Sequence, residues 1–162
     1  GLTVLHPACC DVLNWGFDGA DEVNAQRWLI KGRGGAMLQE KILAARCREY
    51  VIIVDESKLV KTLGSTCPVP VEVIPEALAV AERGLLGLGA TSIKLRDGVA
   101  RDRCVPIITQ AGNLILDVEF STVSSSLERD IKAIVGVVEN GMFIGYASEV
   151  LIATSQGVRS MR

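Results

Sequence analysis

The sequence predicts an α/β protein made of an open, Rossmann-like parallel-sheet domain and a smaller ferredoxin-like α+β domain. The apolar, β-branched run at residues 50–54 is typical of a buried parallel strand, and a helical pattern with one apolar stripe precedes it. Residues 67–141 then follow the order β-α-β-β-α-β of a ferredoxin-like unit. We therefore expect one domain from residues 1–66 with 142–162, and a second from residues 67–141.

In the first domain, apolar runs predict the strands and a helical period predicts one helix. The helix expected over residues 36–48 carries Leu38, Ile42 and Ala45 along one stripe, which would pack on the sheet. The run at residues 150–154 would return the chain to the first sheet. Strands are expected over residues 13–17, 28–30, 50–54 and 150–154, with Leu2, Val4 and Leu5 as candidates for a short one before His6.

In the second domain, turn residues separate segments with alternating apolar positions. Prolines bracket and interrupt the strand expected over residues 69–74, so we place that strand at a sheet edge. The run Ser-Ser-Leu-Glu at residues 125–128 fits a capping box that opens a helix, and Asn140-Gly141 is a turn signal. The remaining elements are strands over residues 92–95, 114–120 and 135–138 and a helix over residues 76–88.

Composition and charge exclude several classes of function. The 162 residues are 49% hydrophobic, which is enough for a core, and the net charge of −2 does not suit a nucleic-acid surface. No apolar run approaches the length of a membrane span, and no signal peptide is visible. We therefore expect neither nucleic acid nor a membrane as a partner.

The cysteines and the histidine argue against a zinc site and for a reducing, cytoplasmic location. The five cysteines are an odd number without a C-x-x-C pair, and His6 is the single histidine. We expect most of these thiols to be buried. His6 has no obvious partner, so a Ser-His-Asp triad is not expected.

Two aspartates follow the first predicted strand. Asp18 and Asp21 flank Gly19-Ala20, and Glu22 is interpreted as a solvated neighbour. Carboxylates at the end of a strand suit the binding of a polar ligand. The same run is also typical of an ordinary turn with a helix-capping aspartate, so it needs support from other residues.

A lysine and a glycine cluster follow the second predicted strand. Lys31 stands at the strand end, then come Gly32, Gly34 and Gly35, and a helix begins near Ala36. Glycines allow close approach of the backbone, and a helix start offers N–H groups and a positive dipole end to an anion. A tight turn is the alternative. Nucleotide fingerprints fit poorly, because the third glycine of G-x-G-x-x-G and the lysine of a Walker A loop are lacking.

Glu40 and Lys58 are the remaining candidates. No same-face neighbour of Glu40 at helical spacing is charged, and a carboxylate on a weakly polar face binds its proton more tightly, as suits a general base. With Lys41 and Arg46 it could instead form a solvated helix face. Lys58 follows the strand over residues 50–54, where open α/β sheets bind ligands, although it could be a surface lysine at a helix start.

Together these motifs resemble the ribose-5-phosphate isomerase type A family. The resemblance rests on FDGADEVN, the ten positions from Asp21 to Lys31, the glycine cluster, and the nine positions from Lys31 to Glu40 in LQEKI. It continues through VIIVDESKLV, PVPVEVIP, GNLILDVEF, GVVENGMF and VLIATSQGV. It therefore covers nearly the whole chain.

The resemblance implies interconversion of ribose 5-phosphate and ribulose 5-phosphate in the pentose phosphate pathway, without metal or organic cofactor. A homodimer or higher homo-oligomer is expected. Glu40 falls on the family's proton-transferring base, and Asp18, Asp21 and Lys31 fall on its other catalytic polar groups. The expected substrate-binding residues are Gly19, Ala20, Gly32, Arg33, Gly34, Gly35 and Lys58.

The sequence departs from the family pattern at three places. Arg33 occupies a glycine position, Gln110-Ala111 stands in the family's TDNGN run, and nothing before Asp18 resembles the family's N-terminal strand–helix segment. An isomerase impaired by a truncated N-terminal segment is therefore one alternative. A non-catalytic module that senses a sugar phosphate is another.

A third interpretation places Mg²⁺ on Asp18, Asp21 and Glu40. The positive charge of Lys31 makes it a poor neighbour for a cation, which argues against this interpretation.

Overall fold

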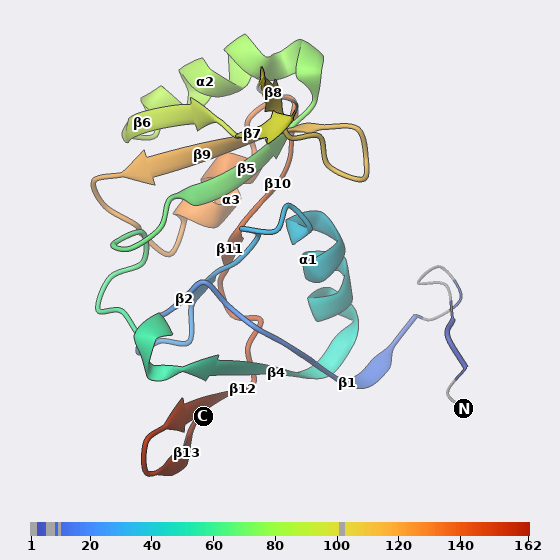
Figure 1. The fold of residues 1–162 in the computed structure, drawn as a ribbon, viewed down its shortest axis with the longest axis vertical. Helices are drawn as coiled ribbons and strands as arrows, with labels where there is room; N and C mark the ends of the chain where they lie inside the picture. The colour runs from blue at the N-terminus through green and yellow to red at the C-terminus, as the bar shows by residue number, and fades with distance from the viewer. Residues whose placement is uncertain (1–2, 6–8, 10, 101–102) are drawn as a thin grey trace.

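The computed structural model describes residues 3–5, 9, 11–100 and 103–162, and its α/β architecture agrees with the predicted fold class (Figure 1). The strands form two four-stranded sheets, one three-stranded sheet and one two-stranded sheet. Within the described ranges, no helix is long and apolar enough to cross a membrane. Residues 3–5 form no strand, and the predicted positions Leu2 and His6 lie outside the described residues.

The first sheet is open and mostly parallel, as predicted, with the order β1-β4-β12-β13. Residues 150–154 do return to this sheet, since β12 pairs in parallel with β4. Strand β13 was not predicted, because its polar, exposed sequence carries no apolar pattern. The bounds are β1 (Leu13–Asp18), β4 (Cys47–Asp55), β12 (Glu149–Thr154) and β13 (Gly157–Met161).

Helix α1 (Met37–Arg46) connects the first segment of the chain to β4, and the side that it buries differs from the predicted one. Ile42 and Ala45 of the predicted stripe are exposed. Two carboxylates of the second domain hold Lys41 inward, a tertiary contact that apolar periodicity cannot reveal. The buried residues of α1 are Met37, Lys41 and Ala44.

Strand β4 is buried on one face only, whereas the sequence predicted a buried parallel strand. Tyr50 and Ile52 point into a core that also contains Val150 and Ile152. On the other face of the sheet, Ile53 of β4 and two aromatic residues of β1 are exposed. These aromatic residues are Trp15 and Phe17.

A third, antiparallel sheet joins the two ends of the chain in the order β11-β3-β2. The strand predicted over residues 28–30 is shorter, and it pairs here with β11 instead of extending the first sheet. Figure 1 shows β11 on the segment that descends from β10 in the second domain toward β12 in the first sheet. The bounds are β2 (Glu22–Val23), β3 (Leu29–Ile30) and β11 (Met142–Phe143).

The second domain has the predicted ferredoxin-like topology, with the antiparallel order β10-β5-β9-β6. Helices α2 and α3 cover one face, where Ala81, Leu85 and Ile131 pack against apolar strand residues. A hairpin between β6 and β9 was not predicted, and the domain boundaries remain a prediction. The elements are β5 (Val69–Val73), η3 (Pro75–Ala77), α2 (Leu78–Gly87), β6 (Ala90–Leu95), β7 (Asp97–Ala100), β8 (Arg103–Pro106), β9 (Leu114–Phe120), α3 (Leu127–Lys132) and β10 (Val137–Asn140).

The prediction that residues 69–74 form an edge strand is wrong, because β5 lies between β10 and β9. The carbonyl of Pro70 accepts a hydrogen bond from the N–H of Gly141, on the β10 side. The pairing of β10 with β5 ends at Asn140 and Val71. Pro70 follows this last pair, so its lack of an N–H group breaks no hydrogen bond between these two strands.

Two local signals have different roles from those predicted. Ser126 makes no side-chain cap, and Glu128 leaves the helix end to bind Lys41, so there is no capping box. Asn140-Gly141 forms no hairpin turn, because the chain passes there from β10 in one sheet to β11 in another. A Cβ atom at Gly141 would lie 2.2 Å from the carbonyl oxygen of Lys31, which explains the glycine.

The expectation of buried thiols is also wrong for the described cysteines. Cys9 and Cys104 are exposed, and Cys47 and Cys67 are half-buried. Burial and the charge of Glu22 raise the pKa of the Cys67 thiol to about 12, so it is not a nucleophile at neutral pH. Cys10 lies outside the described residues.

Candidate active site

The ammonium group of Lys31 lies at the centre of the candidate site. Its Nζ atom is 3.0 Å from Oδ2 of Asp18 and 3.4 Å from Oε2 of Glu40, and it donates to the carbonyl of Gly19. Only 3% of the side chain is exposed. The backbone N–H of Lys31 donates to Gly141 at 2.8 Å, so the far end of the chain fixes this residue.

Asp18, at the end of β1, is held by three donors. Its Oδ1 accepts from the N–H of Gly19 at 2.8 Å, and its Oδ2 accepts from the hydroxyl of Tyr50 at 3.0 Å, close to Lys31. Burial raises the pKa of Tyr50, and the negative charge of Asp18 raises it further. The phenol therefore stays protonated and keeps donating to this carboxylate.

Tyr50 was missed as a site residue by the sequence analysis, which treated it as part of an apolar strand. The residue is 1% exposed, and a buried tyrosine hydroxyl needs a hydrogen-bond partner. That requirement is the one signal in the sequence that could have pointed to Tyr50, but it does not identify Asp18 as the partner.

Glu40 lies in the first turn of α1, and its carboxylate faces Lys31. Burial raises the pKa of Glu40 above its ordinary value of 4.5; the charge of Lys31 opposes this shift, and that of Asp18 adds to it. Its Oε2 atom is buried without a hydrogen-bond donor from the described part of the chain. Such a carboxylate is well suited to accept a proton.

The glycine loop between β3 and α1 requires glycine at two positions. Gly32 has φ +97° and Gly35 has φ +79°, which side chains other than glycine rarely adopt. A Cβ atom on Gly32 would also lie 2.8 Å from the Cβ atom of Met37. The N–H of Arg33 donates to Oδ2 of Asp21 at 3.2 Å, while the Arg33 side chain is exposed.

Arg96 in the second domain braces this loop, and the sequence analysis missed it. Its Nη1 donates to the carbonyls of Gly32 and Arg33 at 2.9 and 3.0 Å. The other nitrogens of the guanidinium bind both carboxylate oxygens of Asp117. The bidentate ion pair with Asp117 therefore fixes the guanidinium that holds the loop.

The predicted site residues converge on one cavity of about 330 Å³. The cavity includes Lys58, which lies in the short helix η2 (Glu56–Lys58) after β4. Gly35 is the one predicted residue that does not line it; an added Cβ there would lie 3.2 Å from Ile115 in the second domain. The lining residues are Asp18, Gly19, Ala20, Asp21, Lys31, Gly32, Arg33, Gly34, Glu40 and Lys58.

Glu22 is not the solvated neighbour that was predicted. It is fully buried, and its carboxylate accepts hydrogen bonds from the backbone N–H groups of Gly64, Thr66 and Cys67. The hydroxyl of Thr66 also donates to it. Glu22 therefore fixes the loop that leads to β5 and takes no part in the cavity.

The Mg²⁺ interpretation meets an obstacle in the geometry. The ammonium of Lys31 lies within ion-pair distance of both Asp18 and Glu40, where a bound cation would be repelled. Over the ranges that the structure describes, no group of three or more potential metal ligands is found.

The fold and the cavity define an α/β protein with an acid–base site for a small polar ligand. A family model described as ribose 5-phosphate isomerase A (phosphoriboisomerase A) matches residues 1–157, and the chain belongs to this family. The family match favours an isomerase over the sugar-phosphate sensor that the sequence left open.

Curated relatives and solved structures agree with this assignment. The chain is 42% identical to ribose-5-phosphate isomerase A of Thermococcus kodakarensis, over 99% of this chain and 70% of the relative. It is 46% identical to that of Thermosynechococcus vestitus, over 94% of this chain and 64% of the relative. The chain thus spans roughly two thirds of the length of these relatives.

Two solved structures have the same fold. Ribose 5-phosphate isomerase A from Methanocaldococcus jannaschii matches with a TM-score of 0.87 and 43% identity, over 93% of this chain and 66% of that one. A D-ribose-5-phosphate isomerase in complex with phospho-erythronic acid matches with a TM-score of 0.89 and 38% identity, over 96% and 67%.

Proposed function

We propose that the chain interconverts D-ribose 5-phosphate and D-ribulose 5-phosphate through an enediolate, in the non-oxidative pentose phosphate branch. The observation that carries the proposal is the pair formed by Glu40 and Lys31, a desolvated carboxylate 3.4 Å from a buried ammonium, in a cavity open to a small substrate. An aldose–ketose isomerase needs both groups, one to move a proton between two carbons and one to stabilise negative charge.

Glu40 acts as the proton carrier. Its carboxylate takes the proton from C2 of the open-chain aldose, and the electron pair of that C–H bond forms the C1–C2 double bond. The C1 carbonyl oxygen becomes the enediolate oxygen. Glu40 then returns the proton to C1 as the C2 oxygen becomes the ketone. A base with a raised pKa can perform both steps near neutral pH.

Lys31 and Asp18 act on the oxygens. The Lys31 ammonium and the N–H groups of the glycine loop stabilise the negative charge that develops on the enediolate. Asp18, held by Tyr50 and Lys31, assists ring opening and moves the hydroxyl proton between O1 and O2. Asp21 binds a sugar hydroxyl.

Lys58, which also lines the cavity, contacts the phosphate of the substrate. The solved relative in complex with phospho-erythronic acid supports a site of this chemistry, because that ligand combines a sugar chain, a carboxylate and a phosphate. The carboxylate is planar and shares its negative charge between two oxygens, as does an enediolate, whose two oxygens stand on adjacent carbons.

The test is to incubate the protein with ribose 5-phosphate in D₂O and to follow the sugar by NMR. The proton held by Glu40 exchanges with solvent before it is returned, so deuterium enters C1 of the ketose and, after the reverse reaction, C2 of the aldose. A protein that binds ribose 5-phosphate in a titration but forms no ribulose 5-phosphate and leaves hydrogen at C2 would be a sensor, and the proposal would be wrong.

We also propose that the protein is a cytoplasmic homo-oligomer. The described cysteines form no disulfide, and Trp15, Phe17 and Ile53 give the first sheet an exposed apolar face that a second copy could cover. Sedimentation of the purified protein tests the assembly, and a monomer at micromolar concentration would contradict it.

A further inference from the structure

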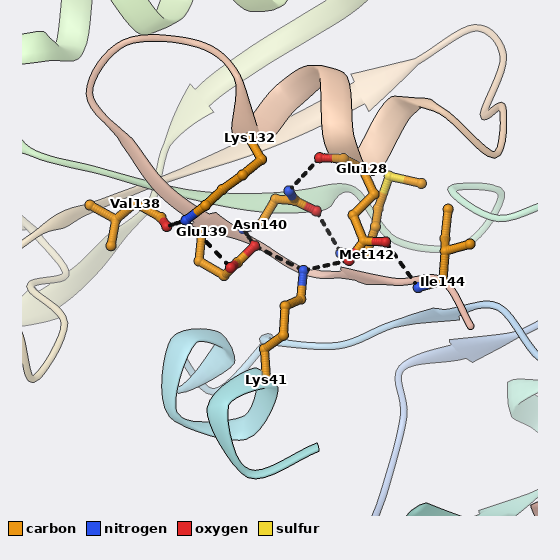
Figure 2. Close-up of polar contacts among 8 residues, drawn as sticks. All are labelled: Lys41, Glu128, Lys132, Val138, Glu139, Asn140, Met142 and Ile144. Atoms are coloured by element: carbon orange, nitrogen blue, oxygen red, sulfur yellow. Dashed lines mark hydrogen bonds and ion pairs between the residues drawn. The ribbon is translucent and has the colours of Figure 1, made fainter. Parts of the chain in front are cut away.

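A buried lysine directly after Glu40 takes no part in the cavity. Lys41 is 5% exposed, and its Nζ lies 2.7 Å from Oε1 of Glu128 and 2.9 Å from Oε1 of Glu139. The ammonium also lies over the ring of Phe143, 4.8 Å from its centroid. Figure 2 shows the side chain reaching from α1 to both carboxylates of the second domain.

The charges of this cluster are balanced. Lys132 lies 3.5 Å from Oε2 of Glu139, so two ammonium groups face two carboxylates, Glu128 and Glu139. Burial of a charge is costly unless partners compensate it, and removal of one partner leaves the other uncompensated. Lys41 is the member of the cluster that comes from α1, whereas the other three belong to α3 and β10.

The two carboxylates are themselves fixed by the backbone. Glu128 accepts from the N–H of Ile144 at 3.2 Å, and Glu139 accepts from the N–H of Asn140 at 2.8 Å. The buried Asn140 side chain donates to the carbonyl of Glu128 and accepts from the N–H of Met142 (Figure 2). Lys41 is therefore attached to a segment that several hydrogen bonds hold in place.

The same segment also holds Lys31. Gly141, which follows Asn140, accepts the hydrogen bond of the Lys31 backbone, and the Phe143 ring lies 5.6 Å from the Lys31 ammonium. The segment over residues 139–143 thus contacts both sides of the candidate site. It holds Lys31 directly, and it holds Glu40 through Lys41.

The other contacts of α1 fix it less well. The helix has ten residues and no side-chain cap at Ala36, and its apolar residues Ile42 and Leu43 are exposed. Met37 and Ala44 are its two buried apolar positions. The ion pairs of Lys41 therefore give α1 directional contacts with the second domain that its two buried apolar positions cannot provide.

We propose that Lys41 is a positioning residue for the reaction, which holds α1 so that the Glu40 carboxylate faces Lys31 and the substrate. The inference rests on the proposed isomerase function. Without the anchor, α1 can shift along the surface of the second domain, and a displacement of about 1 Å at a reacting group can lower the rate on the order of 10²-fold.

The experiment compares three variants at a temperature at which all are folded. Lys41→Met keeps the length of the side chain and removes the anchor. Lys132→Met is the matched control, because it removes a charge from the same cluster without releasing α1. Lys41→Met with Glu128→Gln restores the balance of charge, so it separates the loss of the anchor from the burial of an uncompensated carboxylate.

We expect Lys41→Met to lower kcat on the order of 10- to 100-fold with little change in KM, and Lys132→Met to change neither by more than about twofold. The double variant should regain the melting temperature of the parent but not its kcat. If the role of Lys41 were purely structural, the double variant would regain both the melting temperature and the kcat of the parent. Equal kcat losses in the two single variants, or none in Lys41→Met, would overturn the inference.

A second measurement needs no activity and so remains informative if the chain is not an isomerase. The Glu40 carboxyl is followed by ¹³C NMR through a pH titration, with Glu40→Gln to identify its signal. We expect the pKa of Glu40 to move toward its ordinary value in Lys41→Met and to stay raised in Lys132→Met. An unchanged titration in Lys41→Met contradicts the inference, whereas failure of the proposed function would appear in the parent protein as absent exchange at C2.

Discussion

Oε2 of Glu40 lies 3.4 Å from Nζ of Lys31, and no donor among the described residues forms a hydrogen bond to it. The two groups form an ion pair, and the charge of Lys31 opposes the upward shift that burial gives the pKa of Glu40. Hydrogen bonds to the charged form would lower the pKa and weaken the base. Burial is the larger effect, so Glu40 keeps a raised affinity for a proton beside Lys31.

Replacement of the base tests this relationship directly. Glu40→Gln should slow deuterium exchange at C2 by about 10²–10⁴-fold, because the amide cannot accept the proton. The far-UV circular dichroism and the binding of phospho-erythronic acid should change little. Glu76→Gln, at an exposed position before α2, is the control. Exchange within a few-fold of the parent would assign the proton transfer to another group.

The raised pKa of Glu40 predicts the acid side of the pH profile. Burial holds this pKa above 4.5, so kcat/KM should fall as the pH decreases through the raised value, above the range of an exposed glutamate. A profile that stays flat down to the ordinary range of a carboxyl group would contradict the assignment. The rate is measured with a coupled assay whose second enzyme is in excess at each pH.

The same shift predicts how stability depends on pH. The folded state disfavours ionised Glu40, so its contribution to stability declines as the pH rises from 4.5 through the raised pKa. Glu40→Gln has no ionisable group at this position, so its stability does not decline in this way. The variant and the parent should melt at similar temperatures near about pH 4, and the variant at the higher temperature near about pH 8. A parent that is the more stable protein at both pH values would show that Glu40 is favourably paired.

Tyr50 should affect the reaction rate through its hydrogen bond to Asp18. Tyr50→Phe removes the 3.0 Å hydrogen bond to Oδ2 of Asp18, and we expect kcat to fall about tenfold, since a hydrogen bond to a charged group contributes about 1.5–3 kcal/mol and water can replace part of it. Tyr146→Phe is the control, because Tyr146 lies beside Phe143 and lines no part of the cavity. Equal rates in both variants would leave Tyr50 a purely structural role.

Arg96 should affect substrate binding more than the chemical step. Arg96→Met removes the donors to the carbonyls of Gly32 and Arg33, so the glycine loop should become mobile and KM should rise about tenfold with a smaller change in kcat. Arg129→Met is the control, because the Arg129 side chain is 81% exposed and its ion pair is with Asp130, away from the loop in the chain. A loss of kcat at constant KM would mean that the loop positions the reacting groups instead.

The family resemblance of the sequence implies glycine at position 33, and we expect the side chain of Arg33 to crowd the cavity that it lines. Arg33→Gly should then bind phospho-erythronic acid several-fold more tightly in a calorimetric titration. Arg33→Ala separates removal of the side chain from the added freedom of glycine. Weaker binding by both variants would show that the guanidinium contacts the phosphate.

The sequence by itself determined the fold class and the content of the cavity. The apolar runs at residues 50–54 and 150–154 predicted the parallel sheet, and the β-α-β-β-α-β order predicted the second domain, because these signals depend on local periodicity. The motif from Asp18 to Glu40 named nine of the ten residues that line the cavity, and Lys58 completes the set. Their catalytic roles remain proposals.

The tertiary structure decided which polar groups are buried and what they hold. Glu22 and Lys41 look like solvated charges in the sequence, yet both are buried, because their partners at Thr66 and Glu128 lie more than forty residues away along the chain. The support of Asp18 by Tyr50 is likewise a contact between two strands. Burial and partners depend on how distant segments pack, and no local pattern of residue types records that packing.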